Sequence, residues 1–188
     1  MAENQISKMD DPLWTPGAER VARSNLRRFE AFLRERFGQS FPDYGALHRW
    51  SVDAPEEFWQ AVWEFTGVRA SRAPEAVLVD AERFPGARWF DGARLNYAEN
   101  LLQRRGNGTA IIARLENGRR QQLSWQELHD AVARAAAALR GAGVGPGDCV
   151  AGMLPNVAET VIAMLAAASI GALWSSCSPD FGVNGVLD

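Results

Sequence analysis

The chain has 188 residues, of which 47% are hydrophobic and 23% charged, and its formal net charge is −3. These values are typical of a globular protein with one or two domains. The small negative charge gives no reason to expect a nucleic acid or an anionic membrane as a partner.

No targeting or membrane-spanning signal is found in the sequence. The first residues, MAENQISKMDD, lack the apolar segment of a signal peptide. The most apolar window, residues 157–173, includes Glu159 and is shorter than the roughly 20 apolar residues of a membrane span. Cys149 and Cys177 fit a reduced protein without disulfides. We therefore expect a cytoplasmic protein.

The N-terminal region is predicted to be helical. We expect residues 1–14 to form a disordered tail, and Thr15 and Pro16 to start a helix as its N-cap and first turn. Apolar residues from Leu26 to Phe37 recur at helical spacing, and Gly38 is placed to end the helix.

A second helix with an aromatic stripe is predicted to follow. Asp53 and Glu56 have the spacing of a capping box, and Gly67 is expected to end this helix. Phe58 and Phe65 lie on one face, with tryptophans beside them. Such a stripe is more often core or domain interface than a ligand site, and we interpret it as packing.

The next segment is predicted to contain little regular structure. Residues 76–79 have the character of a short strand, and residues 84–92 are rich in turn formers, which indicates an extended linker. Asn96 and Glu99 are expected to cap a brief helix. The chain then becomes polar and glycine-rich, and we predict a domain boundary between residues 103 and 104.

A β-hairpin and a helix are predicted after this boundary. Residues 110–115 and 120–123 read as strands, and Asn117-Gly118 between them is a hairpin signal because both residue types tolerate positive φ. Ser124 and Glu127 form a capping box for a helix that ends in the glycine-rich run 141–147.

The C-terminal part reads as strand, helix and strand. Residues 149–154 form an apolar run, Asn156 and Glu159 are expected to cap a helix, and Gly171 is expected to end it. Residues 172–175 are the second strand. Two strands joined by a helix are expected to be parallel with a right-handed crossover.

The serine-rich segment 175–179 is predicted to leave this second strand at its carboxyl end, where ligands gather in parallel sheets. Its hydroxyls could bind a ligand. The alternative is that they only satisfy backbone groups in a tight turn.

Familiar catalytic motifs are absent from the sequence. The glycine run 141–147 follows a helix and precedes a strand, which is the wrong context for a phosphate loop. Neither His48 nor His129 has partners at metal-ligand spacing, so no metal site is predicted. No G-x-S-x-G elbow is present, and Cys177 has no base in an identifiable motif. We therefore predict no catalytic residue in this chain.

Three segments nevertheless resemble a known family. LHRWSVDAPEEFW (47–59), WFDGARLNYAENLL (89–102) and GALWSSCSPDFGVNGVLD (171–188) are similar to segments of the adenylate-forming acyl-CoA synthetases. The SSCSPDFG loop resembles the acetoacetate branch of that family. The resemblance extends from about residue 15 to the end of the sequence.

The resemblance implies an α/β fold. It consists of a helical N-terminal extension (15–103) followed by the first, incomplete part of the mixed or parallel sheet of the AMP-binding domain (104–188). It also implies an ATP-dependent ligase with small-molecule substrates, using ATP, Mg²⁺ and CoA, that makes acetoacetyl-CoA through an acyl-adenylate. The family's phosphate loop and catalytic lysine do not occur here. We therefore expect an inactive N-terminal portion whose partner is the C-terminal portion of the same enzyme.

The resemblance also implies site residues. Trp174, Ser175 and Ser176 match positions where acetyl-CoA synthetases place the wall of the pantetheine and thiol passage, although related enzymes have glycines at the two serine positions. A large aromatic residue with small neighbours suits a narrow channel. Two other functions stay open: another short-chain acyl-CoA synthetase, and a non-catalytic module with the same partial fold.

Overall fold

Glycine sets the ends of two helices in the N-terminal part of the chain. The computed structural model describes residues 12–187. Within them, α2 (Asn25–Phe37) ends at Gly38 with φ 66°, and α4 (Pro55–Thr66) ends at Gly67 with φ 64°. Glycine adopts this left-handed conformation without the steric cost of a Cβ atom. Both predicted helix ends are confirmed.

The predicted start of the first helix is wrong. The chain forms a short α1 (Ala18–Ala22) with Gly17 at its N-cap, and α2 begins separately. Ser24 caps α2, because its Oγ accepts a hydrogen bond from the Arg27 amide at 3.3 Å. A local serine cap therefore divides what the apolar spacing predicts as one helix. The first eleven residues of the predicted disordered tail lie outside the described part of the chain.

The capping box predicted at Asp53 is also wrong. Asp53 is the last residue of α3 (Tyr44–Asp53), and the N-cap of α4 is Ala54, which makes no side-chain cap hydrogen bond. Pro55 occupies the first turn of α4, where its missing N–H has no cost. One residue thus separates two helices, and Asp53 already belongs to the first of them.

The residues up to Gly67 form one of two compact units, which are Met1–Gly67 and Val68–Asp188. In the first unit, Leu33 is fully buried, and Phe29, Leu47 and Ala61 are also buried around it. The rings of Phe29 and Phe65 lie 5.0 Å apart. Aromatic pairs of this kind stabilise a core by about 0.5–1.5 kcal/mol each. The packing interpretation of the aromatic stripe is confirmed.

The second unit starts with a pair of strands, of which the sequence analysis predicts only the first. β1 (Ala76–Val79) pairs antiparallel with β2 (Arg88–Asp91). The interpretation of residues 84–92 as an extended linker is therefore wrong at its C-terminal end. Arg88 adds polar contacts that hydrophobic alternation does not reveal: its guanidinium lies 2.9 Å from Asp80, just after β1, and 3.2 Å from Asp91 of its own strand.

The predicted hairpin and capped helix are confirmed. β3 (Thr109–Arg114) and β4 (Arg120–Ser124) pair antiparallel, and of the two turn residues Gly118 has the positive φ, at 80°. α6 (Trp125–Gly141) begins with both hydrogen bonds of the Ser124–Glu127 capping box.

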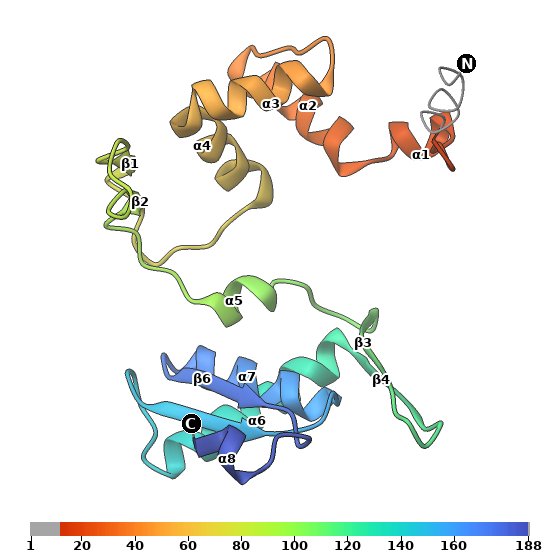
Figure 1. The fold of residues 1–188 in the computed structure, drawn as a ribbon, viewed down its shortest axis with the longest axis vertical. Helices are drawn as coiled ribbons and strands as arrows, with labels where there is room; N and C mark the ends of the chain where they lie inside the picture. The colour runs from red at the N-terminus through yellow and green to blue at the C-terminus, as the bar shows by residue number, and fades with distance from the viewer. Residues whose placement is uncertain (1–11, 188) are drawn as a thin grey trace, which may run out of the picture. The chain divides into compact units, whose positions relative to one another are not determined.

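The predicted parallel strand pair is confirmed as well. β5 (Cys149–Met153) and β6 (Leu173–Cys177) are parallel, and α7 (Ala158–Ser169) connects them (Figure 1). The predicted cap of α7 is wrong: its N-cap is Val157, without a side-chain bond. The hydroxyl of Thr160 instead donates to the Pro155 carbonyl at 2.7 Å. Two short helices, α5 (Tyr97–Leu101) and α8 (Val183–Leu187), complete the second unit.

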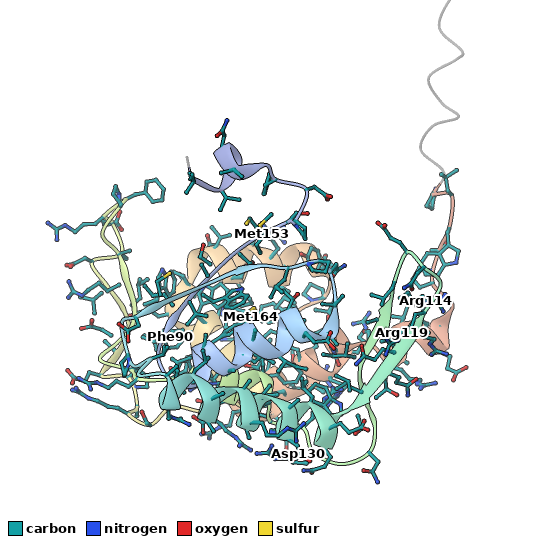
Figure 2. The ribbon with its side chains drawn as sticks, turned by 90° about the horizontal axis from the view of Figure 1, so that it is seen from below. Phe90, Arg114, Arg119, Asp130, Met153 and Met164 are labelled. Carbon is teal, nitrogen blue, oxygen red and sulfur yellow. The ribbon has the colours of Figure 1, made fainter. Side chains whose placement is uncertain are left out.

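The β5–β6 pair is covered on one face only. Leu165, Ala166 and Ala167 of α7 are buried with Leu128 and Val132 of α6 in the core of this unit. Figure 2 shows Met164 on the side of α7, and Met153 on the opposite side of the strands, together with α8. Met153 is 52% exposed and Leu173 is 62% exposed. The sheet is therefore the incomplete start of an α/β domain, as predicted.

None of the helices formed by residues 12–187 combines the length and the apolar character needed to cross a bilayer.

Candidate functional site

The candidate site is built on β5 and β6, whose carboxyl ends lie side by side. The register pairs Val150 with Trp174, Ala151 with Ser175 and Gly152 with Ser176. β6 continues to Cys177, two residues beyond the predicted end of the strand. Ser175 and Ser176 are therefore strand residues, and the loop that follows starts at Ser178.

Strand alternation separates two of the predicted site residues. Successive side chains of a strand point to opposite faces of the sheet. Trp174 packs against the α6–α7 core. Ser175 thus belongs to the open face, together with Ala151, and it is exposed.

Trp174 covers Gly152 so closely that any side chain there would have to displace the indole or the strand. A Cβ atom on Gly152 would lie 2.6 Å from Cη2 of the Trp174 indole and 3.2 Å from Cδ1 of Leu154. The φ of Gly152 is not in the left-handed region, so the glycine is required by space and not by backbone conformation. The indole and the glycine form one packed unit across the strand pair.

A cavity of about 300 Å³ includes the two serines. It is lined by Ala151, Gly152, Met153, Ser175, Ser176 and Cys177 of the strands and by Gly185 and Val186 of α8. Its lining does not include Trp174 among the described residues, although Gly152, which the indole covers, belongs to it. The cavity combines small polar groups with a thioether and a thiol. The role of Trp174, Ser175 and Ser176 as channel residues stays a prediction.

A second cavity lies where the two strands end. Its volume is about 710 Å³, and it is lined by residues 114–117 of the hairpin turn, 155–157 after β5 and 178–180 after β6. Ser178 shapes the last segment, because its hydroxyl donates to Asp180 at 2.9 Å and accepts from the Asp180 amide at 3.3 Å. Of this cavity the sequence analysis singled out only Ser178 and Pro179, at the end of the serine-rich segment 175–179. The signal available was the polar stretch that follows each strand.

Asn96 connects α7, the helix between the two strands, to the segment that precedes the hairpin. Its Oδ1 accepts from the Glu99 amide at 3.1 Å, which is the predicted cap of α5. Its Nδ2 donates to the Ala168 carbonyl at 2.9 Å, in the last turn of α7. One side chain therefore satisfies the start of one helix and the end of another.

Asn100 fixes the segment that enters the second unit. Its Oδ1 accepts from the backbone N–H of Arg69 at 2.8 Å, and its Nδ2 donates to the Arg69 carbonyl at 2.9 Å. This pairing replaces the strand partner that the Arg69 backbone lacks. Both asparagines lie in the segment 89–102 that carries the family resemblance.

Comparison with known proteins agrees with this architecture. Residues 98–186 match the family of AMP-binding enzymes, and residues 44–101 match the acetyl-coenzyme A synthetase N-terminus. These two segments of the chain are therefore similar to AMP-binding enzymes and to the N-terminal region of acetyl-coenzyme A synthetases.

The relatives with high identity are acetoacetyl-CoA synthetases. The acetoacetyl-coenzyme A synthetase of Rhizobium meliloti (strain 1021) is 52% identical over 94% of this chain and 27% of its own length. The acetoacetyl-CoA synthetase of Danio rerio is 44% identical over 94% of this chain and 26% of its own length. A malonamoyl-CoA synthetase of Penicillium aethiopicum is 36% identical over 95% and 25% of the two chains.

A solved structure gives the same result. The acetoacetyl-CoA synthetase from Streptomyces lividans matches with a TM-score of 0.88 at 45% identity, over 94% of this chain and 28% of that one. The chain is thus a homologue of acetoacetyl-CoA synthetases, and it spans about a quarter of the length of the curated relatives it matches.

Proposed function

We propose that the chain is the N-terminal part of an ATP-dependent acid–thiol ligase that makes acetoacetyl-CoA. The observation that carries this proposal is the match to acetoacetyl-CoA synthetases over 94% of the chain at up to 52% identity. In the proposed reaction, a carboxylate oxygen of acetoacetate displaces diphosphate from ATP, and the CoA sulfur then displaces AMP from the acyl carbon.

The adenylation step is assigned to residues outside this chain. Stabilising the charge that develops on the phosphates requires cationic groups and a metal ion around them. Residues 12–187 contain no group of three or more His, Cys, Asp or Glu side chains that could hold a metal ion, and the sequence has no phosphate loop. The residues present therefore do not fit ATP with Mg²⁺, and we derive no step through them.

The cavity on the open face of β5–β6 fits a different group, the pantetheine arm of CoA. We assign Ser175 and Ser176 to its wall, and Trp174 to a supporting position behind Gly152. A volume of about 300 Å³ with small side chains admits a narrow, flexible arm. The Ser175 hydroxyl would bind an amide group of the arm, and the exclusion of larger side chains would keep the passage open.

The thiol passage is tested by filling it. The test uses a longer polypeptide that includes this chain and extends to the full length of its relatives. In it, Ser175→Leu is expected to raise the KM for CoA about tenfold or more, because the added side chain occupies the passage. Acetoacetate-dependent exchange of diphosphate into ATP, which needs no CoA, is expected to stay unchanged. Ser40→Leu, an equal change at an exposed serine of the first unit, is the control. An unchanged KM for CoA in Ser175→Leu would refute the assignment.

Acid specificity separates the acetoacetate ligase from the other short-chain synthetases. The malonamoyl-CoA synthetase shows that a relative acts on another short acid. We expect the ratio kcat/KM to be higher for acetoacetate than for acetate and propionate, measured side by side. A clear preference for acetate would overturn the acetoacetate assignment and leave the ligase class intact. We place the enzyme in the cytoplasm, where CoA and ATP are available.

A further inference from the structure

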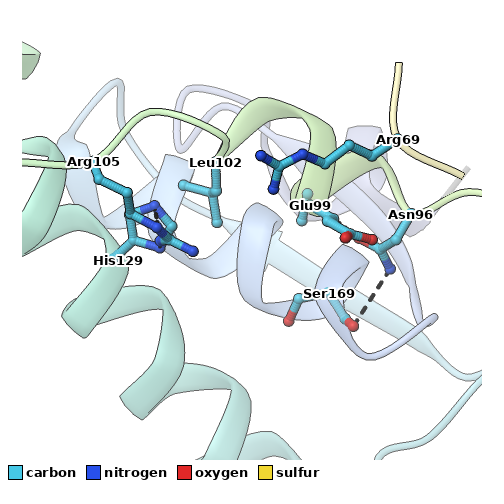
Figure 3. A pocket seen from close by; sticks show the side chains of 8 residues that line it. Arg69, Asn96, Glu99, Leu102, Arg105, His129 and Ser169 are labelled. Atoms are coloured by element: carbon cyan, nitrogen blue, oxygen red, sulfur yellow. Dashed lines mark hydrogen bonds between the residues drawn. The ribbon is translucent and has the colours of Figure 1, made fainter. Parts of the chain in front are cut away.

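A third cavity in the second unit shares no lining residue with the two cavities at the strand pair. Its volume is about 350 Å³. Charged or ionisable side chains come to it from four places: Arg69 before β1, Glu99 on α5, Arg105 after α5 and His129 on α6 (Figure 3). The buried side chains of Ala98 and Leu102 form its apolar floor.

The two guanidinium groups of this cavity form no ion pair with a carboxylate of residues 12–187. The ion pairs formed among residues 12–187 involve other arginines, including Arg36, Arg72 and Arg88. The guanidinium of Arg105 instead contacts the ring nitrogens of His129. The Nε2 atom of that ring also lies 3.1 Å from the Arg104 carbonyl. Arg105 and His129 are therefore neighbours in the lining of the cavity.

The neutral polar groups at the cavity are already engaged. The Asn96 amide donates to the Ala168 carbonyl at 2.9 Å, and the Ser169 hydroxyl donates to the Ala166 carbonyl at 2.7 Å. The donors that remain are the N–H groups of the arginines. Such a set favours an oxyanion over a neutral or cationic ligand, because guanidinium groups bind phosphate oxygens through paired, charge-assisted hydrogen bonds.

Hydrogen bonds with Asn100 hold the backbone of Arg69 in place without any ligand. Asn100 holds both the N–H and the carbonyl of Arg69 at 2.8 and 2.9 Å. Figure 3 shows the Arg69 guanidinium extending from this anchor toward Leu102 and Glu99. A fixed backbone reduces the conformational entropy that is lost when the side chain binds a ligand.

We propose that this cavity binds a phosphate-class anion, inorganic phosphate or diphosphate, between Arg69, Arg105 and His129. The anion neutralises the excess of positive over negative charge in the lining. Glu99, the single carboxylate in the lining, opposes binding, so two arginines are needed to outweigh it. The proposal does not depend on the ligase function, because none of these residues belongs to the thiol passage.

The test uses the two histidines of the chain as reporters, since His48 and His129 are the only ones in the sequence. Imidazole NMR signals of the purified 188-residue chain are followed while phosphate, diphosphate or sodium chloride is added at constant ionic strength. The His129→Gln variant assigns the signals. Saturable shifts of the His129 signals, with His48 unchanged, are expected for phosphate or diphosphate and not for chloride.

Variants decide whether the cavity is the site. Arg69→Gln and Arg105→Gln are each expected to weaken binding about tenfold, and Arg105→Lys to restore part of it. Arg119→Gln, at an exposed hairpin arginine, is expected to bind like the original chain. Shifts that grow linearly with concentration, equal losses in Arg119→Gln, or full binding in the Arg69→Gln/Arg105→Gln double variant would overturn the proposal. Comparing the two titrations shows whether phosphate or diphosphate binds more tightly.

Discussion

At the residue scale, the contact between Gly152 and Trp174 determines the geometry of the strand pair. Gly152→Ala places a Cβ atom where Cη2 of the indole lies 2.6 Å away, so the ring or the strand must move. We expect a loss of about 1–3 kcal/mol in the free energy of unfolding, measured by urea denaturation. Gly182→Ala is the control, because nothing lies within 4 Å of a Cβ atom at Gly182. Equal stability of the two variants would show that the indole does not pack as described.

Trp174→Phe provides a second check on the same contact. The smaller ring leaves room for a methyl group, so the double change Gly152→Ala/Trp174→Phe is expected to lose less stability than the sum of the two single changes. Additive losses would contradict a direct contact between the two residues.

The pKa of Glu127 leads to a prediction of how the stability of the chain depends on pH. Hydrogen bonds from the backbone and then from the hydroxyl of Ser124 stabilise the carboxylate and hold the pKa of Glu127 below its usual value of 4.5. A lowered pKa means that the capping box contributes stability above pH 4.5 and that this contribution is lost as the pH falls through the lower folded-state pKa. An NMR titration of the Glu127 carboxyl carbon is expected to show its inflection below 4.5.

Removing the hydroxyl of Ser124 separates the two causes of this shift. In Ser124→Ala, the backbone hydrogen bond remains and the pKa of Glu127 is expected to rise only part of the way to its usual value. An inflection at the usual value in the original chain would show that the capping box does not form.

Residues with purely local roles were predictable from the sequence, and residues whose role depends on distant partners were not. Gly38, Gly67 and Ser124 act on neighbours within a few positions, and each was predicted correctly. Nothing in the local sequence shows that Gly152 faces an indole from another strand, since that contact depends on the register.

At the element scale, Asn96 connects α5 to the last turn of α7. Asn96→Ala removes both the cap of α5 and the hydrogen bond to the Ala168 carbonyl. We expect the free energy of unfolding to fall by about 1–2 kcal/mol. Asn107→Ala, at an exposed asparagine, is the control.

Asn96→Asp tests the connection by itself. The aspartate keeps the oxygen that caps α5 and loses the N–H donor that reaches α7. Its stability is therefore expected to lie between those of the original chain and Asn96→Ala. A variant as stable as the original chain would mean that the bond to α7 contributes nothing.

The sequence located the helices and strands better than their ends. Asp53 and Asn156 have the right spacing to a glutamate for a capping box, but Asp53 ends the preceding helix and Asn156 is displaced by the turn that Thr160 closes on Pro155. The extension of β6 to Cys177 was missed because serine and cysteine have no strong strand pattern. The pairing with β5 determines this extension.

At the scale of the whole chain, the open face of β5–β6 predicts self-association. Met153 and Leu173 expose apolar surface beside strand edges that pair with nothing in the described residues. The 188-residue chain is expected to form dimers or larger species as its concentration rises, measured by light scattering. Leu173→Glu is expected to shift the equilibrium toward monomer, and Leu13→Glu, at an exposed leucine of the first unit, to leave it unchanged. A monomer at all concentrations with a sharp thermal transition would contradict this.

The central claim is that these residues form a scaffold for a ligase whose phosphate chemistry is carried out elsewhere. It is tested most directly by incubating the purified 188-residue chain with acetoacetate, ATP and Mg²⁺ and measuring exchange of labelled diphosphate into ATP. A polypeptide that extends over the length of the relatives serves as the positive control. The account predicts no exchange above the protein-free blank for the 188-residue chain. Formation of an acyl-adenylate by this chain alone would contradict it.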